Sequence, residues 1–279
     1  MSTDYHAWVG REETLTANIQ LQAVQAMAAT LDLSAAPNMG EPLPPGWQWL
    51  FFNPVARRSG LGTDGHPQRG GFLPPVELPR RMWAGSRIRY LANLPVGAEA
   101  VRHSRIAKVE NKIGKRGALW FVTVEHTTSC VGTTCMIEEQ DIVYREATLP
   151  GAVAPAPQPY EGQAQWGREF QPDTTLLFRY SALTFNGHRI HYDQAYARNE
   201  EGYPDLVVHG PLTATLLQQL ALEYGGGRPL ASFEFRGVSP LFVSRPFRLE
   251  GSVAQDGALA LWARGPGGEL AMSATAVLR

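Results

Sequence analysis

The sequence has little of what would place it in a specialised class. Among 279 residues there are two cysteines, and 25 basic side chains nearly balance 26 acidic ones, for a formal net charge of −1. With a pI near 6.7, the chain has no excess of positive charge of the kind that releases counterions from a phosphate backbone, so no nucleic-acid partner is expected.

Long apolar runs and export signals are also missing. No stretch approaches the roughly 18 uninterrupted apolar residues that predict a membrane-spanning helix, so no membrane partner is expected. The first residues, MSTDYHAWVGREETL, contain neither a basic segment nor an apolar segment typical of a secretory signal. We therefore expect a cytoplasmic protein.

The two cysteines, Cys130 and Cys135, flank a short VGTT segment. Without an export signal, two reduced thiols beside a turn are expected, and a disulfide that closes a hairpin is the alternative. No His–Cys cluster with ligand spacing, no phosphate-binding glycine loop and no dinucleotide fingerprint is present, so neither a metal nor a cofactor is expected.

What the chain does have is material for a core: 44% of its residues are hydrophobic and 18% are charged. Its clearest internal boundary is Leu149–Gly167, LPGAVAPAPQPYEGQAQWG, in which four prolines interrupt any helical or strand period. This segment predicts a linker at residues 149–167 between a first half, residues 1–148, and a second half, residues 168–279.

Each half shows helical material followed by strands. The first half predicts a helix over Leu15–Leu31, a short buried helix at Trp47–Phe52, and a Gly114–Gly117 turn between two strands. The second half predicts a strand or helix lead-in at Leu176–Ser181 and a long apolar helix over Pro211–Tyr224. The predicted strands are Ser86–Tyr90, Val101–Glu110, Ala118–Ser129, Cys135–Arg145, Leu230–Val238, Phe247–Gln255, Ala258–Arg264 and Glu269–Leu278. A long helix against an antiparallel sheet, present twice, predicts an α+β fold of two similar units.

The histidines are the side chains best suited to proton transfer near neutral pH. His6, His66, His103 and His126 stand alone in the sequence, which favours structural or surface roles for them. In contrast, His188, His191 and His209 lie close together, just before the long helix.

Two neighbours of these histidines have clear local roles. Asp193 is a good N-cap for a helix at Gln194–Glu201. Gly210 begins the long helix, where free backbone N–H groups favour a developing negative charge. A histidine and such a donor suffice for chemistry beside a carbonyl, and the alternative is a loop that only caps helices.

The segment RYSALTFNGHRIHYDQAYARNEEGYPDLVVHGPLTATLL resembles the MaoC-like, (R)-specific enoyl-CoA hydratase/dehydratase family, whose motif has the form G-D-x-N-P-I-H-x-D followed by H-G. The resemblance implies that His191 is the catalytic histidine and that the N–H of Gly210 forms the oxyanion hole. Asn186 falls on the family's catalytic aspartate, His188 on the motif asparagine, and Asp193 on the trailing acid.

The variant F-N-x-H-R-I-H-Y-D is similar to the double hot-dog branch, in which two helix-wrapped antiparallel sheets form one continuous sheet. PPGWQWLFF, GHPQRGGFLPPVELPRRMWAG and EEQDIVYRE in the first half resemble segments of 3-methylfumaryl-CoA (mesaconyl-C4-CoA) hydratases and their relatives. The resemblance implies syn addition of water to a 2-enoyl-CoA, with His191 as acid/base, Asn186 holding water and His188 as a relay or hydrogen-bond partner. The first half would be a degenerate unit that shapes the substrate tunnel.

A CoA substrate needs cations for its phosphates, and a dicarboxylyl substrate needs one more for its carboxylate. The candidates are Arg57, Arg58, Arg80, Arg81 and, inside the motif, Arg189 with its neighbour Asp193. Itaconyl-CoA hydration, a 3-hydroxyacyl-thioester dehydratase and a non-catalytic acyl-CoA binding protein are the alternatives, the last because an asparagine cannot act as a base. A homodimer is possible through sheet edges.

Overall fold

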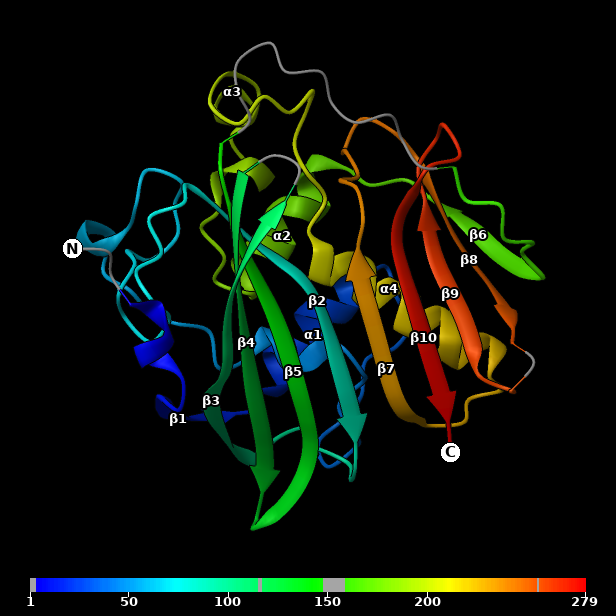
Figure 1. Cartoon of the computed structure of the whole chain (residues 1–279). Helices are drawn as coiled ribbons and strands as arrows, with labels where there is room; N and C mark the ends of the chain where they lie inside the picture. The colour runs from blue at the N-terminus through cyan, green and yellow to red at the C-terminus, as the bar shows by residue number, and fades with distance from the viewer. Residues whose placement is uncertain (1–3, 115–116, 148–158, 255) are drawn as a thin grey trace.

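The computed structural model describes residues 4–114, 117–147, 159–254 and 256–279. Within them, ten strands form one antiparallel sheet in the order β1-β3-β4-β5-β2-β7-β10-β9-β8-β6 (Figure 1). The strands of the first half therefore occupy one side of the sheet and those of the second half the other. This is the continuous sheet expected of a double hot-dog.

The first half contributes five strands, which are β1 (Glu12–Asn18), β2 (Arg80–Tyr90), β3 (Glu99–Gly114), β4 (Gly117–Cys130) and β5 (Thr133–Arg145). Strand β4 has the alternation expected from the sequence, since Val122 and Val124 are buried while the residues between them are only half-buried. The four predicted strands of this half are confirmed, each with longer bounds.

The second half contributes β6 (Trp166–Phe170), β7 (Leu230–Gly237), β8 (Phe247–Val253), β9 (Leu259–Arg264) and β10 (Leu270–Leu278). Strands β2 and β7 pair directly, with the buried side chains of Ile88 and Phe233 in register. The two halves thus share one hydrogen-bonded ladder.

The helices are α1 (Leu21–Thr30), α2 (Thr174–Leu183), α3 (Gln194–Asn199) and α4 (Gly210–Tyr224), with short 3₁₀ turns η1 (Tyr5–Trp8), η2 (Trp47–Leu50), η3 (Arg58–Gly60) and η4 (Arg189–His191). Figure 1 shows α1 and α4 on the same side of the sheet, with α4 against the strands of the second half. Leu212, Leu217 and Leu220 of α4 are fully buried, and each contributes about 1.5–3 kcal/mol of hydrophobic stabilisation. The double hot-dog prediction is confirmed.

Two segments have a secondary structure that differs from the predicted one. The helix predicted over Leu15–Leu31 is a strand, β1, followed by the shorter helix α1. The alternating exposure of β1 and its β-branched residues Thr14 and Thr16 explain why this stretch is extended. Strand β6 was missed because it begins at Trp166, inside the predicted linker.

Two further predicted segments are helical in the structure. The short buried helix is confirmed as η2, and Leu176–Ser181 lies within helix α2. Residues 149–158 of the predicted linker, with the preceding residue 148, and residues 115–116 of the predicted turn lie outside the described residues, so the division into domains stays a prediction.

Cys130 and Cys135 are buried, unpaired thiols, so the expectation of reduced cysteines is confirmed and the disulfide alternative is wrong. Among the described residues, no helix combines the length and the apolar character that crossing a membrane requires.

Candidate active site

The motif Asn186–Asp193 connects α2 to α3 through a tight turn. Phe185 adopts a left-handed backbone with φ 49°, a strained conformation for a residue with a side chain. The turn brings the N–H of Asn186 to the carbonyl of Ser181 at 2.8 Å. The Asn186 side-chain oxygen accepts the N–H of His188 at 3.0 Å, so its amide group is the part that can donate to a ligand.

His191 is buried at the end of η4. Its Nδ1 lies 2.7 Å from the carbonyl of Val207, and a carbonyl can only accept, so Nδ1 carries the proton and Nε2 is the acceptor in the neutral ring. Burial lowers the pKa of His191 to about 4, although the bond to Val207 opposes the shift. His191 is therefore a neutral imidazole with an available base nitrogen near pH 7.

The ring of His209 stacks on that of His191, with centroids 3.7 Å apart and planes at 18°. Nε2 of His209 is 2.8 Å from the hydroxyl of Ser181, while its buried Nδ1 has no hydrogen-bond partner among the described residues. Burial, together with His191 and His188, lowers the pKa of His209. Both stacked rings are accordingly neutral.

Gly210 is the first residue of α4, directly after the N-cap His209. Its N–H has no partner within the helix, and no atom lies within 4 Å of the position that a Cβ would take. A backbone donor at the helix N-terminus thus follows directly on His209, whose ring stacks on that of His191, as expected for an oxyanion site.

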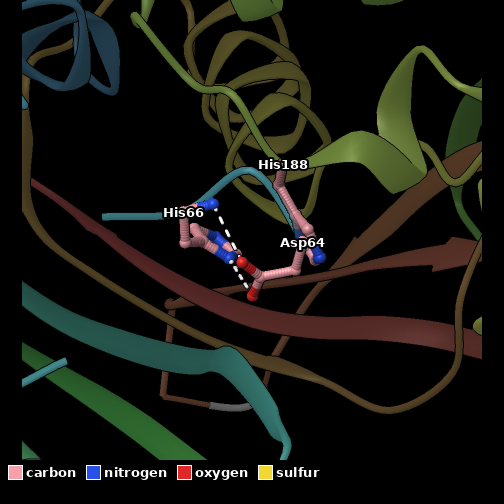
Figure 2. Close-up of side chains that lie close together, drawn as sticks. All are labelled: Asp64, His66 and His188. Carbon is pink, nitrogen blue, oxygen red and sulfur yellow. Dashed lines mark hydrogen bonds and ion pairs between the residues drawn. The ribbon is translucent and has the colours of Figure 1, made fainter. Parts of the chain in front are cut away.

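A loop of the first half, Thr63–Pro67, completes the site. Asp64 and His66 come from this loop and face His188 (Figure 2). Nδ1 of His66 lies 3.0 Å from Oδ2 of Asp64, whose Oδ1 accepts the backbone N–H of His66 at 3.0 Å. The rings of His66 and His188 have centroids 4.1 Å apart, and that of His188 is 5.4 Å from that of His191.

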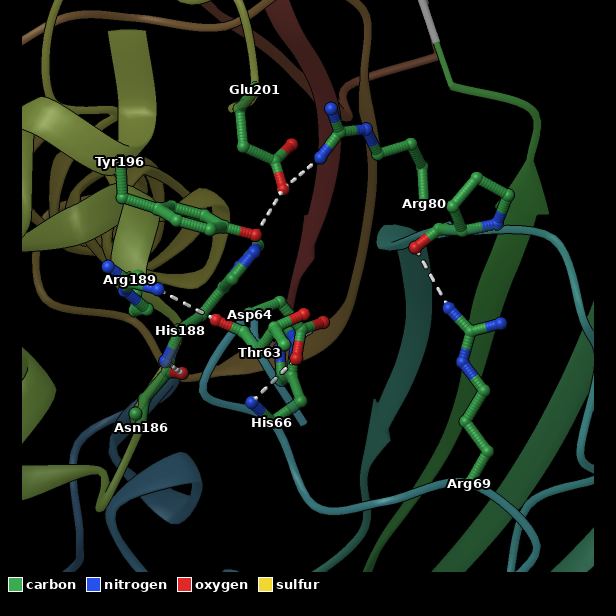
Figure 3. Close-up of polar contacts among 12 residues, drawn as sticks. Thr63, Asp64, His66, Arg69, Arg80, Asn186, His188, Arg189, Tyr196 and Glu201 are labelled. Carbon is green, nitrogen blue, oxygen red and sulfur yellow. Dashed lines mark hydrogen bonds and ion pairs between the residues drawn. The ribbon is translucent and has the colours of Figure 1, made fainter. Parts of the chain in front are cut away.

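The loop is docked on the motif by backbone contacts. Arg189 donates its N–H to the carbonyl of Asp64 at 2.9 Å and its guanidinium to the carbonyl of Thr63 at 3.0 Å (Figure 3). Gly65 has φ +86°, and a Cβ there would lie 1.9 Å from the carbonyl oxygen of Gly187. Only glycine permits this approach, which sets the position of His66 relative to the motif.

In this region Asp64 is held in its charged form, whereas the pKa values of His66 and His188 are lowered toward the neutral form. Burial alone would raise the pKa of Asp64, but the hydrogen bond and charge of His66 outweigh it and lower the pKa, so Asp64 is a carboxylate. Burial lowers the pKa of His66, and the bond to Asp64 opposes that shift. Burial, then the charges of His66 and His191, lower the pKa of His188.

The arginines predicted to bind CoA or a carboxylate lie in different surroundings. Arg189 pairs with Asp193 at 2.8 Å and lies over the ring of Tyr196, so part of its role is to hold the motif together. Arg80 pairs with Glu201 (Figure 3) and donates to the carbonyl of Glu200. The other three are exposed Arg57, exposed Arg58 and half-buried Arg81, whose charge acts on His66.

The structure therefore brings together Asn186, His188, His191 and Gly210, and Asp193 is the N-cap of α3 as expected. It also brings in Asp64 and His66, and the prediction that His66 stands apart from any partner was wrong. The signal was present in D-G-H, where a carboxylate two residues before a histidine can turn back on its backbone N–H. Nothing in the sequence indicated that this turn would meet His188.

Asp64, His66 and His188 also offer ligand atoms that all lie within 4.8 Å of one another. Two of the three already share a hydrogen bond, which accounts for this spacing without an ion. The expected absence of a metal stays a prediction.

Comparisons with known proteins agree with this fold and site. Over 281 residues, covering 99% of each chain, the protein is 50% identical to the Mesaconyl-C(4)-CoA hydratase of Chloroflexus aurantiacus. It is 31% identical to the mitochondrial Hydroxyacyl-thioester dehydratase type 2 of Schizosaccharomyces pombe, over 74% of this chain and 77% of the other.

Among solved structures, a MaoC-like dehydratase from Phytophthora capsici has a similar fold, with a TM-score of 0.69, 16% identity and coverage of 99% of this chain and 98% of the other. Residues 46–243 match the sequence profile described as Hydroxyacyl-thioester dehydratase type 2. The matched region includes the loop, the motif and the start of α4, and the chain belongs to the hydroxyacyl-thioester dehydratase type 2 family.

Proposed function

We propose that this protein is a hydro-lyase that reversibly adds water to a 2-enoyl-CoA thioester, and that its substrate is a short dicarboxylyl-CoA such as 3-methylfumaryl-CoA (mesaconyl-C4-CoA). The observation that carries the reaction type is the neutral, buried His191, whose ring stacks on that of His209, the residue directly before the helix-starting Gly210. The full-length 50% identity to a protein named Mesaconyl-C(4)-CoA hydratase supports the substrate.

The geometry supports the following sequence of steps. The amide of Asn186 donates to the oxygen of a water, which places one hydrogen toward Nε2 of His191. As the water oxygen bonds to the β-carbon, its proton passes to that nitrogen and the electrons of the double bond move onto the thioester oxygen. The N–H of Gly210 stabilises this enolate, and the α-carbon then takes a proton on the same face.

Asn186 occupies the position of the family motif's carboxylate, so it orients water without accepting a proton. The non-catalytic alternative, an acyl-CoA binding protein, depends on this substitution. Itaconyl-CoA hydration and a 3-hydroxyacyl-thioester dehydratase of fatty-acid metabolism use the same steps with another acyl group.

The test is loss of the enoyl-thioester absorbance with mesaconyl-C4-CoA, itaconyl-CoA and crotonyl-CoA in parallel. We expect the highest kcat/KM with mesaconyl-C4-CoA, and a loss of at least about 100-fold in kcat for His191→Ala. A preference for crotonyl-CoA would refute the dicarboxylyl substrate, and CoA binding without turnover of any of the three would refute the enzyme.

The remaining parts of the proposal concern assembly and location. Phe178, Phe185 and Tyr192 are exposed aromatic residues on and beside α2, which supports a homodimer that covers them. Size-exclusion chromatography with light scattering tests this, and a monomer refutes it. We propose a cytoplasmic protein that acts on free acyl-CoA, with no metal and no other cofactor.

A further inference from the structure

Hydration requires two proton transfers, one from the attacking water and one to the α-carbon. Nε2 of His191 can accept the first, because its Nδ1–H is held by Val207. In the family motif the second group would be a carboxylate at position 186, but this chain has Asn186, which has no proton to exchange at neutral pH. The motif by itself lacks one of its two proton-transfer groups.

The Asp64–His66 pair lies beside His188, which is two residues from Asn186 in the motif. Asp64 holds Nδ1 of His66 at 3.0 Å, which leaves Nε2 as the nitrogen that can exchange a proton, and a carboxylate in this position stabilises the imidazolium. The ring of His66 lies 4.1 Å from that of His188, and the docked Gly65 and Arg189 fix the loop on the motif.

We propose that His66, held by Asp64, is the acid–base residue for the α-carbon, so that the first half supplies a catalytic group to the second. This rests on the proposed function. In hydration, Nε2 of His191 takes one proton from water as the carbon–oxygen bond forms. Before hydration His66 takes a proton from solvent, and the carboxylate of Asp64 stabilises this imidazolium against the cost of burial. The α-carbon of the enolate then takes that proton from Nε2 of His66, and His66 becomes neutral.

After hydration, His66 and His191 must return to their starting protonation states. The proton gained by His191 returns to His66 through His188, whose ring lies between the other two, or through solvent. His66 and His191 together hold the same number of protons before and after a turnover. The net change is addition of one water to the double bond. Dehydration runs in reverse: His66 removes the α-proton and the His191 imidazolium protonates the departing hydroxyl.

The test compares His66→Ala and Asp64→Asn with matched substitutions in another histidine–carboxylate pair. Nε2 of His103 lies 3.3 Å from Oε2 of Glu12 on the outer strands β3 and β1, so His103→Ala and Glu12→Gln are the controls. We expect kcat to fall about 100-fold or more in His66→Ala and roughly tenfold in Asp64→Asn, with little change in KM. The controls should stay within about threefold of the unmodified protein.

Free imidazole separates a chemical role from a structural one. The side chain of His66 is 22% exposed, so imidazole can reach the space left by His66→Ala and should restore kcat roughly tenfold or more. A second readout is exchange of the product's α-hydrogen in deuterium oxide, which His66→Ala should abolish and imidazole should restore.

Three results would overturn the inference. The first is a kcat of His66→Ala within about threefold of the unmodified protein, and the second is a loss that imidazole leaves unchanged. The third is one equivalent of bound zinc in the purified protein whose removal abolishes activity, because the three side chains would then be ligands. If the unmodified protein turns over none of the three thioesters, the proposed function fails instead, independently of His66.

Discussion

The rings of His66 and His188 lie 4.1 Å apart, although one belongs to a loop of the first half and the other to the motif of the second. They continue into a row of four rings, since His188 contacts His191 and His191 stacks on His209. The site is therefore assembled from both halves of the chain.

The backbone N–H of Gly210 can be tested by a substitution that removes this donor. Gly210→Pro deletes it at the first helical position, where proline is tolerated, and the preceding His209 already has the extended ψ of 130° that a following proline requires. We expect kcat to fall about 100-fold or more in an enoyl-CoA assay.

Gly210→Ala is the matched control, because it retains the N–H and no atom lies within 4 Å of the added Cβ. It should lose less than about tenfold in kcat. Equal losses in the two variants would contradict an oxyanion role for this group.

The contact between Gly65 and Gly187 predicts that the loop cannot tolerate a side chain. Gly65→Ala places a Cβ 1.9 Å from the Gly187 carbonyl oxygen, so the loop must move away from His188. We expect a loss of activity comparable to that of His66→Ala and a loss of roughly 1–3 kcal/mol in the free energy of unfolding, measured by urea denaturation.

Gly40→Ala is the control, since Gly40 also has a positive φ, of +81°, but no neighbour within 4 Å. It should show the cost of backbone strain and retain activity. Retained activity in both Gly65→Ala and Gly40→Ala would contradict a role for the Gly65–Gly187 contact in positioning His66.

A carboxylate restored to the motif should compensate for the loss of His66. Asn186→Asp retains the oxygen that accepts the N–H of His188 and adds a group that can exchange a proton. In the His66→Ala background we expect Asn186→Asp to raise kcat roughly tenfold or more. No increase in the double variant would show that position 186 cannot take over this role.

Three buried histidines predict loss of stability in mild acid. Burial lowers the pKa of His126 to about 3 and of His191 to about 4, and it lowers that of His209 as well. In the unfolded chain each returns to its ordinary value of 6.5, so the unfolded state binds more protons between that value and the folded pKa. Their contribution is complete above pH 6.5 and decreases as the pH falls.

The expected slope is about 1.4 kcal/mol per pH unit for each histidine below pH 6.5, measured by urea denaturation at pH 7.5, 6.5 and 5.5. His126→Asn should reduce this slope by about 1.4 kcal/mol per pH unit. A free energy of unfolding that stays constant over this range would contradict the burial argument.

The predicted phosphate-binding arginines should separate into two groups. Arg57 and Arg58 are exposed, and replacing both with alanine should raise KM for the CoA thioester roughly tenfold, less at high salt. Arg80 is paired with Glu201, so Arg80→Ala should mainly lower the free energy of unfolding and should change KM little. An unchanged KM in the double variant would remove the two exposed residues from the CoA site.

Much of the fold could be predicted from the sequence, because the central strands alternate apolar and polar residues and helix α4 is a long apolar segment between Pro211 and Gly225. The strands that were missed, β1 and β6, are the two edges of the sheet. An edge strand pairs on one side only and needs fewer buried residues, so its pattern is weak.

The candidate site, like the fold, was predicted only in part. Asn186, His188, His191 and Gly210 were predicted because they fall on a family motif that lies within one segment of the sequence. Asp64 and His66 reach the site through the docking of one backbone on another at Gly65 and Gly187. That approach depends on two glycines in different halves, and no periodicity or spacing within either half records it.

The direct pairing of β2 with β7 also limits how the site can open. Two units joined only by a linker can swing apart, but here that motion would break a ladder of backbone hydrogen bonds in the middle of the sheet. Entry and exit of a ligand must therefore come from movement of the loop that carries Asp64 and His66, and not from a hinge between the halves.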